Sequence, residues 1–267
     1  MNQTSNVKKS NSNAGGALAE VFSLAEAKQG DGLSNVSTKD VMIPRIKLLQ
    51  KMSPETDNES LPKAKAGQIF NSASQNVYDG PSGIRVVPCE YIRTYVEWAP
   101  EGTGNKAPVN IHPATSDIMS KAKKSPTDNR FYLDNGNYVE ETANHIVLIL
   151  DDNNNVESRG ILTMKSSQLK KSRQWNYMMM TATMESGGKT ITPPSYAIVY
   201  RLSSIQEETN GKKYFGWTVA KEGFVPTKEV FTTGEAFALA FRQGDVLAAP
   251  EGDEPKQIAS NDGPERF

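Results

Sequence analysis

Residues 196–219 read YAIVYRLSSIQEETNGKKYFGWTV, and this stretch predicts a β-hairpin whose register can be written down. Asn210-Gly211 is a strong signal for a two-residue turn, because both residues tolerate the positive φ that such a turn requires. With these two residues in the turn, three pairs of residues face each other across the strands: Thr209 and Lys212, Glu207 and Tyr214, Leu202 and Val219.

Side chains alternate between the two faces of a strand, so the same register predicts an apolar and a polar face for this hairpin. The apolar face carries Tyr196, Ile198, Tyr200, Leu202, Phe215, Trp217 and Val219. The polar face carries Arg201, Ser203, Lys212, Tyr214 and Thr218. We therefore expect Trp217 to pack in a core, and Arg201, Lys212 and Tyr214 to be available for contact with a partner.

A long strand is predicted upstream, from Ile84 to Trp98, because its even positions are nearly all apolar. Its odd positions place Arg93 between Tyr91 and Tyr95 on the face that we expect to be wet. A cation between two rings suits a surface on which bases stack. An ordinary exposed strand face is the alternative, since Tyr and Arg are common there.

Two further elements complete the predicted body. Residues 146–150 (IVLIL) form a buried strand, residues 151–155 (DDNNN) form its turn, and residues 159–164 return as the second strand of a hairpin. Residues 234–243 (GEAFALAFRQ) form a short helix, with Phe237, Leu239, Ala240 and Phe241 buried against the sheet. The predicted class is α+β and mainly β.

Positive charge is concentrated in residues 159–180, RGILTMKSSQLKKSRQWNYMMM, which contain no acidic residue. A helix is expected from Ser166 or Ser167 to about Thr181. Its packing side would carry Leu169, Ser172, Asn176, Met179 and Met180, with Trp175 at the edge, and its opposite side Lys170, Arg173, Gln174 and Tyr177. Cations and a tyrosine on one face favour a polyanion with exposed bases. A solvated charged face is the alternative.

The bulk composition excludes several classes of site. The chain has 267 residues, a formal net charge of −1 and one cysteine, Cys89, so a disulfide framework and a zinc cluster are not expected. His112 and His145 are the only histidines, which disfavours a histidine-rich metal site. No apolar run suits a signal peptide or a membrane span. We therefore expect no metal and no cofactor.

Three regions follow from the composition. Residues 1–40 are expected to be a disordered arm with a short helix from Ala17 to Lys28. Residues 41–244 are expected to form a single mainly β domain that binds DNA. Residues 245–267 are expected to be a flexible tail, in which six acids outnumber Lys256 and Arg266.

A polar arm, a mainly β body with a basic helix, and an acidic tail ending in Phe267 together resemble bacteriophage single-stranded DNA-binding proteins. This resemblance implies an OB-fold-like antiparallel barrel whose groove binds single strands. It also implies that Glu265 and Phe267 dock the tail onto phage replication proteins. Residues 41–54, VMIPRIKLLQKMSP, look like a segment seen in phage proteins.

These features predict a protein that binds single-stranded DNA during phage replication or recombination, in the cytoplasm of the host cell, and is not an enzyme. The residues expected to bind DNA are Tyr91, Arg93, Tyr95, Lys165, Lys170, Lys171, Arg173, Tyr177, Arg201, Lys212 and Tyr214. Association of the chain with copies of itself stays open. A virion structural or assembly protein is the first alternative. A Mg²⁺-dependent nuclease or recombinase that uses Glu140, Glu141 or Asp151 is the second.

Overall fold

The computed structural model describes residues 14–28, 31–35, 43–57, 64–100, 102–103, 107–209 and 211–243. The chain divides into two compact units, residues 1–41 and residues 42–267. In the first unit, Ala14–Ala27 forms helix α1, which confirms the helix expected in this region. The arm before α1 and the tail at residues 245–267 lie outside the described residues, as do the predictions made for them.

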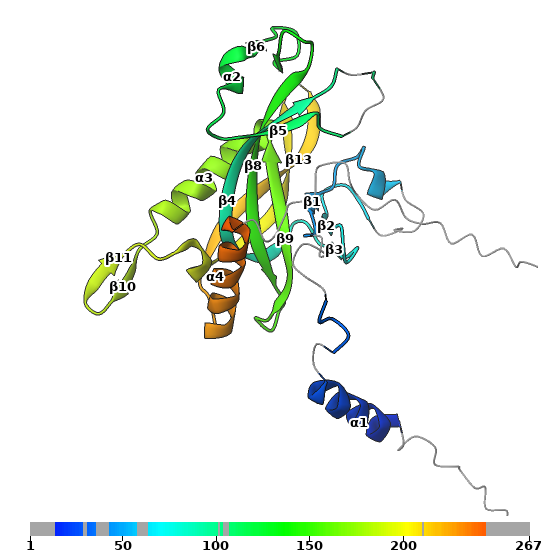
Figure 1. Ribbon diagram of the computed structural model, residues 1–267, viewed down its shortest axis with the longest axis vertical. Helices are drawn as coiled ribbons and strands as arrows, with labels where there is room; N and C mark the ends of the chain where they lie inside the picture. The colour runs from blue at the N-terminus through cyan, green and yellow to red at the C-terminus, as the bar shows by residue number, and fades with distance from the viewer. Residues whose placement is uncertain are drawn as a thin grey trace, which may run out of the picture. The chain divides into compact units, whose positions relative to one another are not determined.

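The second unit is built on an antiparallel sheet that curls into a half-barrel (Figure 1). Among the described residues the sheet has eight strands in the order β13-β12-β4-β8-β7-β6, with β5 paired to β4 and β9 paired to β8. The long strands are β4 (Ile84–Trp98), β8 (Tyr138–Leu150), β9 (Val156–Lys165), β12 (Ile198–Thr209) and β13 (Lys212–Phe224). The short ones are β5 (Asn110–Pro113), β6 (Lys123–Lys124) and β7 (Phe131–Tyr132). The mainly antiparallel β class expected from the sequence is confirmed.

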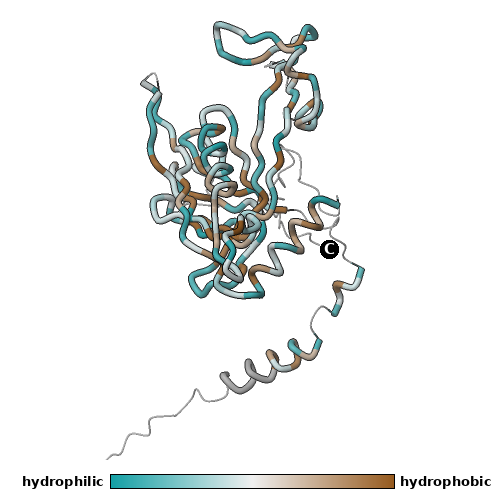
Figure 2. The backbone as a smooth tube through the Cα atoms, turned by 90° about the vertical axis from the view of Figure 1, so that its left-hand side faces the viewer, coloured by the Kyte–Doolittle hydropathy of each residue, from teal (hydrophilic) through white to brown (hydrophobic). Residues whose placement is uncertain are grey.

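Each face of the sheet is covered by its own apolar cluster. One cluster contains Val86, Val147, Leu202 and Trp217, together with Trp175 from helix α3 (Leu169–Met180). The other contains Val87, Cys89, Leu148 and Ile161, together with Phe237 from helix α4 (Lys228–Arg242). The apolar residues fall mainly on the strands and on these helices, whereas the outer loops are mainly hydrophilic (Figure 2). Because the middle of the sheet is buried on both faces, its strands there are continuous apolar runs.

A second, smaller sheet lies beside β9 (Figure 1). It consists of β1 (Ile46–Leu48), β2 (Ile69–Asn71) and β3 (Val77–Tyr78). Residues 43–57, which we call the strap, include β1 and the single turn η2 (Pro54–Thr56). The strap meets β9 at a parallel bridge between Arg45 and Ile161. Gly160 permits this approach, because a Cβ at that position would lie 2.6 Å from Cγ1 of Ile46.

The remaining described elements are short connections: α2 (Ile118–Lys121), η3 (Ser166–Gln168), β10 (Met184–Ser186), β11 (Lys189–Ile191) and η4 (Ser195–Ala197). No helix among the described residues is both long enough and apolar enough to span a bilayer.

The register predicted for the 196–219 hairpin is confirmed. Thr209 pairs with Lys212, Glu207 with Tyr214 and Leu202 with Val219. Trp217, which the register placed on the apolar face, is 3% exposed. The hairpin of β8 and β9 around residues 151–155 is confirmed as well.

Strand β4 has the predicted bounds, but its alternation is interrupted. Its pairing with β8 shifts between Pro88 and Glu90, where Pro88 cannot donate a backbone hydrogen bond to the ladder. Tyr91 consequently packs against the same cluster as Trp175, and Glu97 is buried. The wet face predicted for the odd positions of this strand was therefore wrong at Tyr91, which is half-buried, and at Val87, Cys89 and Glu97, which are buried.

The two main helices also match the sequence with local corrections. Helix α4 begins at Lys228, six residues before the predicted start, because the hydroxyl of Thr227 accepts a hydrogen bond from the N–H of Val230 and caps it. Leu239, expected to be buried, is 51% exposed. In α3 the predicted edge residue Trp175 is fully buried, whereas Met180, expected on the packing side, is 76% exposed.

Candidate functional site

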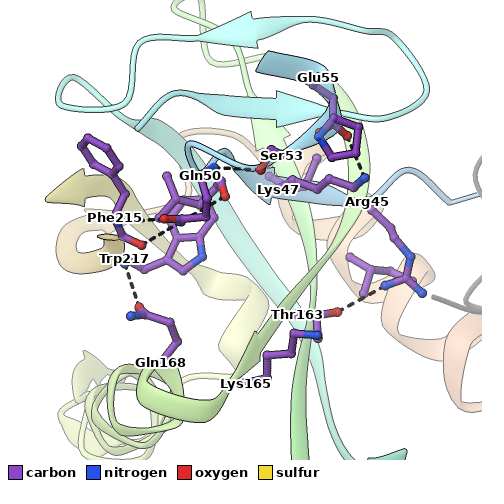
Figure 3. A pocket seen from close by; sticks show the side chains of 14 residues that line it. Arg45, Lys47, Gln50, Ser53, Glu55, Thr163, Lys165, Gln168, Phe215 and Trp217 are labelled. Atoms are coloured by element: carbon purple, nitrogen blue, oxygen red, sulfur yellow. Dashed lines mark hydrogen bonds and ion pairs between the residues drawn. The ribbon is translucent and has the colours of Figure 1, made fainter. Parts of the chain in front are cut away.

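A groove between the strap and the sheet gathers cations beside aromatic rings (Figure 3). Its volume is about 390 Å³, and we call it the strap groove. Its walls come from the strap, from β9, from η3 and from β13. Arg45, Lys47 and Lys165 line it with a single carboxylate, Glu55, so the charged lining is positive overall.

Each cation of the strap groove is held by a neighbour. Nη1 of Arg45 donates to the hydroxyl of Thr163 at 3.4 Å. Nζ of Lys47 lies 2.9 Å from Oε1 of Glu55, and Nζ of Lys165 lies 3.2 Å from Oε2 of Glu140. The side chains of Lys47 and Lys165 nevertheless stay 28% and 44% exposed. Each of the three cations thus has a partner within the fold, and the two lysines remain partly open to solvent.

One wall of the strap groove is the edge strand β13, and two amide side chains form hydrogen bonds with its outer backbone groups. Gln50 accepts from the N–H of Phe215 and donates to its C=O, both at 2.9 Å (Figure 3). Oε1 of Gln168 accepts from the N–H of Trp217 at 2.8 Å. Because β13 pairs on its other side with β12, these bonds take up backbone groups that would otherwise be open to another chain.

The two rings of the groove differ in what they can contact. Trp217 is 3% exposed and serves the core, as the hairpin register predicted. Phe215, which the register also placed on the apolar face, is only half-buried. Its ring lies directly over Gly67, where a Cβ would be 2.6 Å from Cε1. Of the two rings, Phe215 is therefore the more exposed.

The cationic face predicted for α3 exists. Lys170, Arg173 and Gln174 are exposed, and Tyr177 is 68% exposed. The predicted concentration of positive charge is, however, partly offset by acids from other strands. Lys171 lies 3.3 Å from Glu207, and Arg173 lies 3.7 Å from Glu141. Together with Glu140 at Lys165, three carboxylates thus face a segment that has none of its own.

Two of the predicted residues on β4, Arg93 and Tyr95, lie next to α3. Glu141, the partner of Arg173, is also the residue that faces Tyr95 in the pairing of β4 with β8. The guanidinium of Arg93 lies 6.0 Å from the centroid of the Tyr95 ring. Arg93 and Tyr95 therefore join the surface of α3. Tyr91 does not, since its ring packs 5.1 Å from that of buried His145.

The predicted residues of the β12–β13 hairpin lie at its two opposite ends. Tyr214 faces Glu207, which pairs with Lys171, so the turn end of the hairpin adjoins α3. Lys212 is exposed at the same end. Arg201 lies toward the opposite end of β12, where it faces Arg85, pairs with Glu222 and donates to the C=O of Ser82. Arg201 therefore lies apart from the predicted residues that adjoin α3, and does not share one continuous surface with them. Glu265 and Phe267 lie outside the described residues.

Two buried groups near these surfaces are held neutral. Burial lowers the pKa of His145 to about 3, and its Nε2 lies 2.8 Å from the hydroxyl of Ser172. The imidazole stacks on Trp175 with ring centroids 4.3 Å apart. Burial also raises the pKa of the Cys89 thiol to about 12. Neither side chain is poised to exchange protons or to act as a nucleophile near neutral pH.

The acids considered for a nuclease are engaged separately. Glu140 pairs with Lys165, Glu141 with Arg173, and Asp151 accepts from the backbone N–H groups of Asn153 and Asn155. The bond from Asn155 is the main cause that holds the pKa of Asp151 below its usual value. Within the part of the chain that the structure describes, no three His, Cys, Asp or Glu residues are grouped to hold a metal ion.

Of the residues that line the groove, only Lys165 was among the predicted site residues; those missed include Arg45, Lys47, Gln50 and Phe215. Arg45, Lys47 and Gln50 belong to the VMIPRIKLLQKMSP segment, in which Arg45 and Lys47 stand at alternate positions. This spacing places two cations on one face of a strand and is the signal that could have indicated the groove. Phe215 carried no such signal, because a half-buried ring and a buried ring look alike in a strand pattern.

Comparison with known proteins gives one relationship. A family model described as Pam3 phage gp34-like protein matches residues 12–247. No curated protein and no solved structure matches the chain.

Proposed function

The chain belongs to the Pam3 phage gp34-like family, and on that premise we propose that it binds single-stranded DNA without strong sequence preference during phage replication or recombination. The observation that supports this proposal is the strap groove, which Arg45, Lys47 and Lys165 line together with the half-buried ring of Phe215. Phosphates bind the cations and release counterions, while a base stacks on the ring.

The strap groove has a natural continuation. Gln168, which lines the groove, immediately precedes α3, and the exposed face of α3 then presents Lys170, Arg173 and Tyr177. Arg93 and Tyr95 adjoin this face through Glu141. A strand leaving the groove past Lys165 thus meets further cations and rings. The pattern favours a flexible single strand, which can follow a curved surface, over a rigid duplex.

The carboxylates at this surface set the expected affinity. Glu140, Glu141 and Glu207 each hold a cation that a phosphate would engage, so DNA must displace them. We therefore expect moderate binding at low salt with a marked loss as salt rises.

The test is fluorescence anisotropy with labelled oligo-dT and with a duplex of the same length, at several salt concentrations. Arg45→Gln and Lys170→Gln should each weaken binding. Each should also reduce, by about 0.7, the steepness with which the logarithm of the binding constant falls against the logarithm of the salt concentration, which is the value for one phosphate contact in a single strand. Lys189→Gln is the matched control, because Lys189 is exposed on β11 and lies outside the groove and α3.

Lack of binding at low salt, or equal binding of duplex and single strand, would overturn the proposal. If the chain binds no DNA and is a constituent of purified particles, the assembly role considered from the sequence takes its place.

A further inference from the structure

A second hollow adjoins the strap groove on the face of the sheet that carries α4. Its volume is about 260 Å³. The two cavities share Arg45, Ile161 and Thr163, so the guanidinium of Arg45 stands at the boundary between them. Because its volume is below the range of about 300–1,000 Å³ usual for drug-sized ligands, the hollow suits a single flat ring.

The walls of this hollow are apolar. Ile92 and Val96 of β4, Ile111 of β5, Ile161 of β9 and Phe241 of α4 line it. Ile111 is 47% exposed, so the rim on the β5 side is open to solvent. Walls of this kind favour a planar group whose faces are poorly hydrated.

The floor, by contrast, is a row of hydroxyl and amide groups that crosses three strands. Oγ1 of Thr163 receives the bond from Arg45 and donates to Oδ1 of Asn144 at 2.8 Å. Nδ2 of Asn144 donates to Oγ1 of Thr94 at 3.2 Å, and Thr94 shares a 2.7 Å bond with Thr142.

This row keeps unused hydrogen-bonding capacity. A carbonyl oxygen has two lone pairs, and the recorded bond to Oδ1 of Asn144 uses one. Each threonine hydroxyl can likewise accept more than one bond. On a sheet face that is otherwise apolar, the floor thus offers hydrogen-bond acceptors to N–H groups at the edge of a ring in the hollow.

We propose that the hollow is a subsite for one nucleobase of the bound single strand, with the phosphate of that nucleotide on Arg45. The inference rests on the proposed function and deepens it. The strap groove holds the sugar–phosphate backbone, and the hollow takes a base that turns away from it at Arg45. The apolar walls contact the faces of the base, and the floor contacts its polar edge.

The experiment compares oligo-dT with an oligonucleotide of the same length whose sugars carry no bases, using anisotropy at low salt. The wild-type protein should bind oligo-dT about tenfold more tightly, since bases contribute through stacking and burial. Ile111→Ala should reduce this preference by about threefold, through lost apolar contact, and leave binding of the abasic strand unchanged. Thr163→Val, which keeps the shape and removes the hydroxyl, should reduce the preference as well.

Two matched controls accompany these variants. Val109 precedes β5, is 49% exposed and does not line the hollow, so Val109→Ala should change neither affinity. Thr218 is a strand hydroxyl bonded to Ser203 outside the hollow, so Thr218→Val controls for Thr163→Val.

The possible outcomes separate the two proposals. Equal affinity for both oligonucleotides would overturn the base subsite and the stacking of a base on Phe215, and would leave only binding of the sugar–phosphate backbone. A preference for oligo-dT that neither Ile111→Ala nor Thr163→Val reduces would place the base elsewhere and overturn the subsite too. Failure to bind either oligonucleotide would overturn the proposed function together with the subsite.

Discussion

Gln50 bonds both backbone groups of Phe215, a residue 165 positions further along the chain. Its side-chain amide hydrogen-bonds to β13 as the backbone of a neighbouring strand would, with one donor and one acceptor, both at 2.9 Å. This contact joins the strap to the edge of the sheet and fixes one wall of the strap groove against the other. Stability and the shape of the candidate site thus depend on the same side chain.

Replacing Gln50 by Ala should lower the free energy of unfolding by about 1–3 kcal/mol, because two partly buried backbone groups lose their partner. Urea denaturation followed by tryptophan fluorescence measures this loss. Gln206→Ala is the control, since Gln206 is exposed on β12 and should change stability by less than about 0.5 kcal/mol. Equal stability of the two variants would show that water replaces the amide of Gln50 without loss.

Removing an acid that faces α3 should strengthen DNA binding. Glu207→Gln keeps the shape of the side chain and frees Lys171, 3.3 Å away, for a phosphate. We expect the affinity for oligo-dT to rise by about two- to fivefold, corresponding to an ion pair of modest strength. Glu208→Gln removes the same charge from the neighbouring exposed position and should have a smaller effect. A similar gain in both variants would indicate a change in overall charge instead of a released lysine.

The stability of the fold should fall in mild acid because of His145. Its pKa is about 3 in the folded chain and about 6.5 when unfolded, so between these values only the unfolded chain takes up the proton. This contribution to stability is complete above pH 6.5 and is lost as pH falls toward 3, at roughly 1.4 kcal/mol per pH unit.

Urea denaturation between pH 7 and pH 5 tests this expectation. His145→Gln should flatten the decline, whereas His112→Gln should retain it, because His112 is half-buried beside Glu97 on the surface of β5. An unchanged decline in His145→Gln would assign the pH dependence to other groups.

Cys89 should report on unfolding. Its thiol is fully buried and its pKa is raised to about 12, so at pH 8 both access and thiolate are lacking. Ellman's reagent should therefore react slowly with the native chain and rapidly in urea. Since Cys89 is the only cysteine, the reaction is read without ambiguity. Rapid reaction of the native chain would show that the contact between α4 and the sheet opens frequently.

The elements that depend on neighbours in sequence could be predicted. The register predicted from Asn210-Gly211 holds for the ten pairs from Thr209 and Lys212 to Tyr200 and Lys221, and shifts by one residue at the bulge between Val199 and Tyr200. The helical spacing around Lys170 correctly separated its cationic face from the side that packs on the sheet. In both cases the relevant residues lie a few positions apart, so local pattern and backbone preference suffice.

Features that depend on residues far apart could not be predicted in the same way. The acids that face α3 come from β8 and β12, and no local pattern couples Glu141 to Arg173 or Glu207 to Lys171. Tyr91, beyond the bulge at Pro88/Glu90, packs half-buried against the cluster of Trp175, although the alternation alone placed it in water. The strap groove was missed because its walls come from three separate segments of the chain, residues 45–55, 161–168 and 215–217.

The strap also bears on how the chain is made. Residues 43–57 are made early and pair with β2 nearby, yet they also contact Ile161, Thr163 and Phe215, which are made much later. Until β13 has been synthesised, the nascent chain holds Ile46 and Gln50 without their final neighbours, and closure of so long a loop is slow. The contacts that close the strap on the main sheet can therefore form only once β13 has been made, late in the synthesis of this unit.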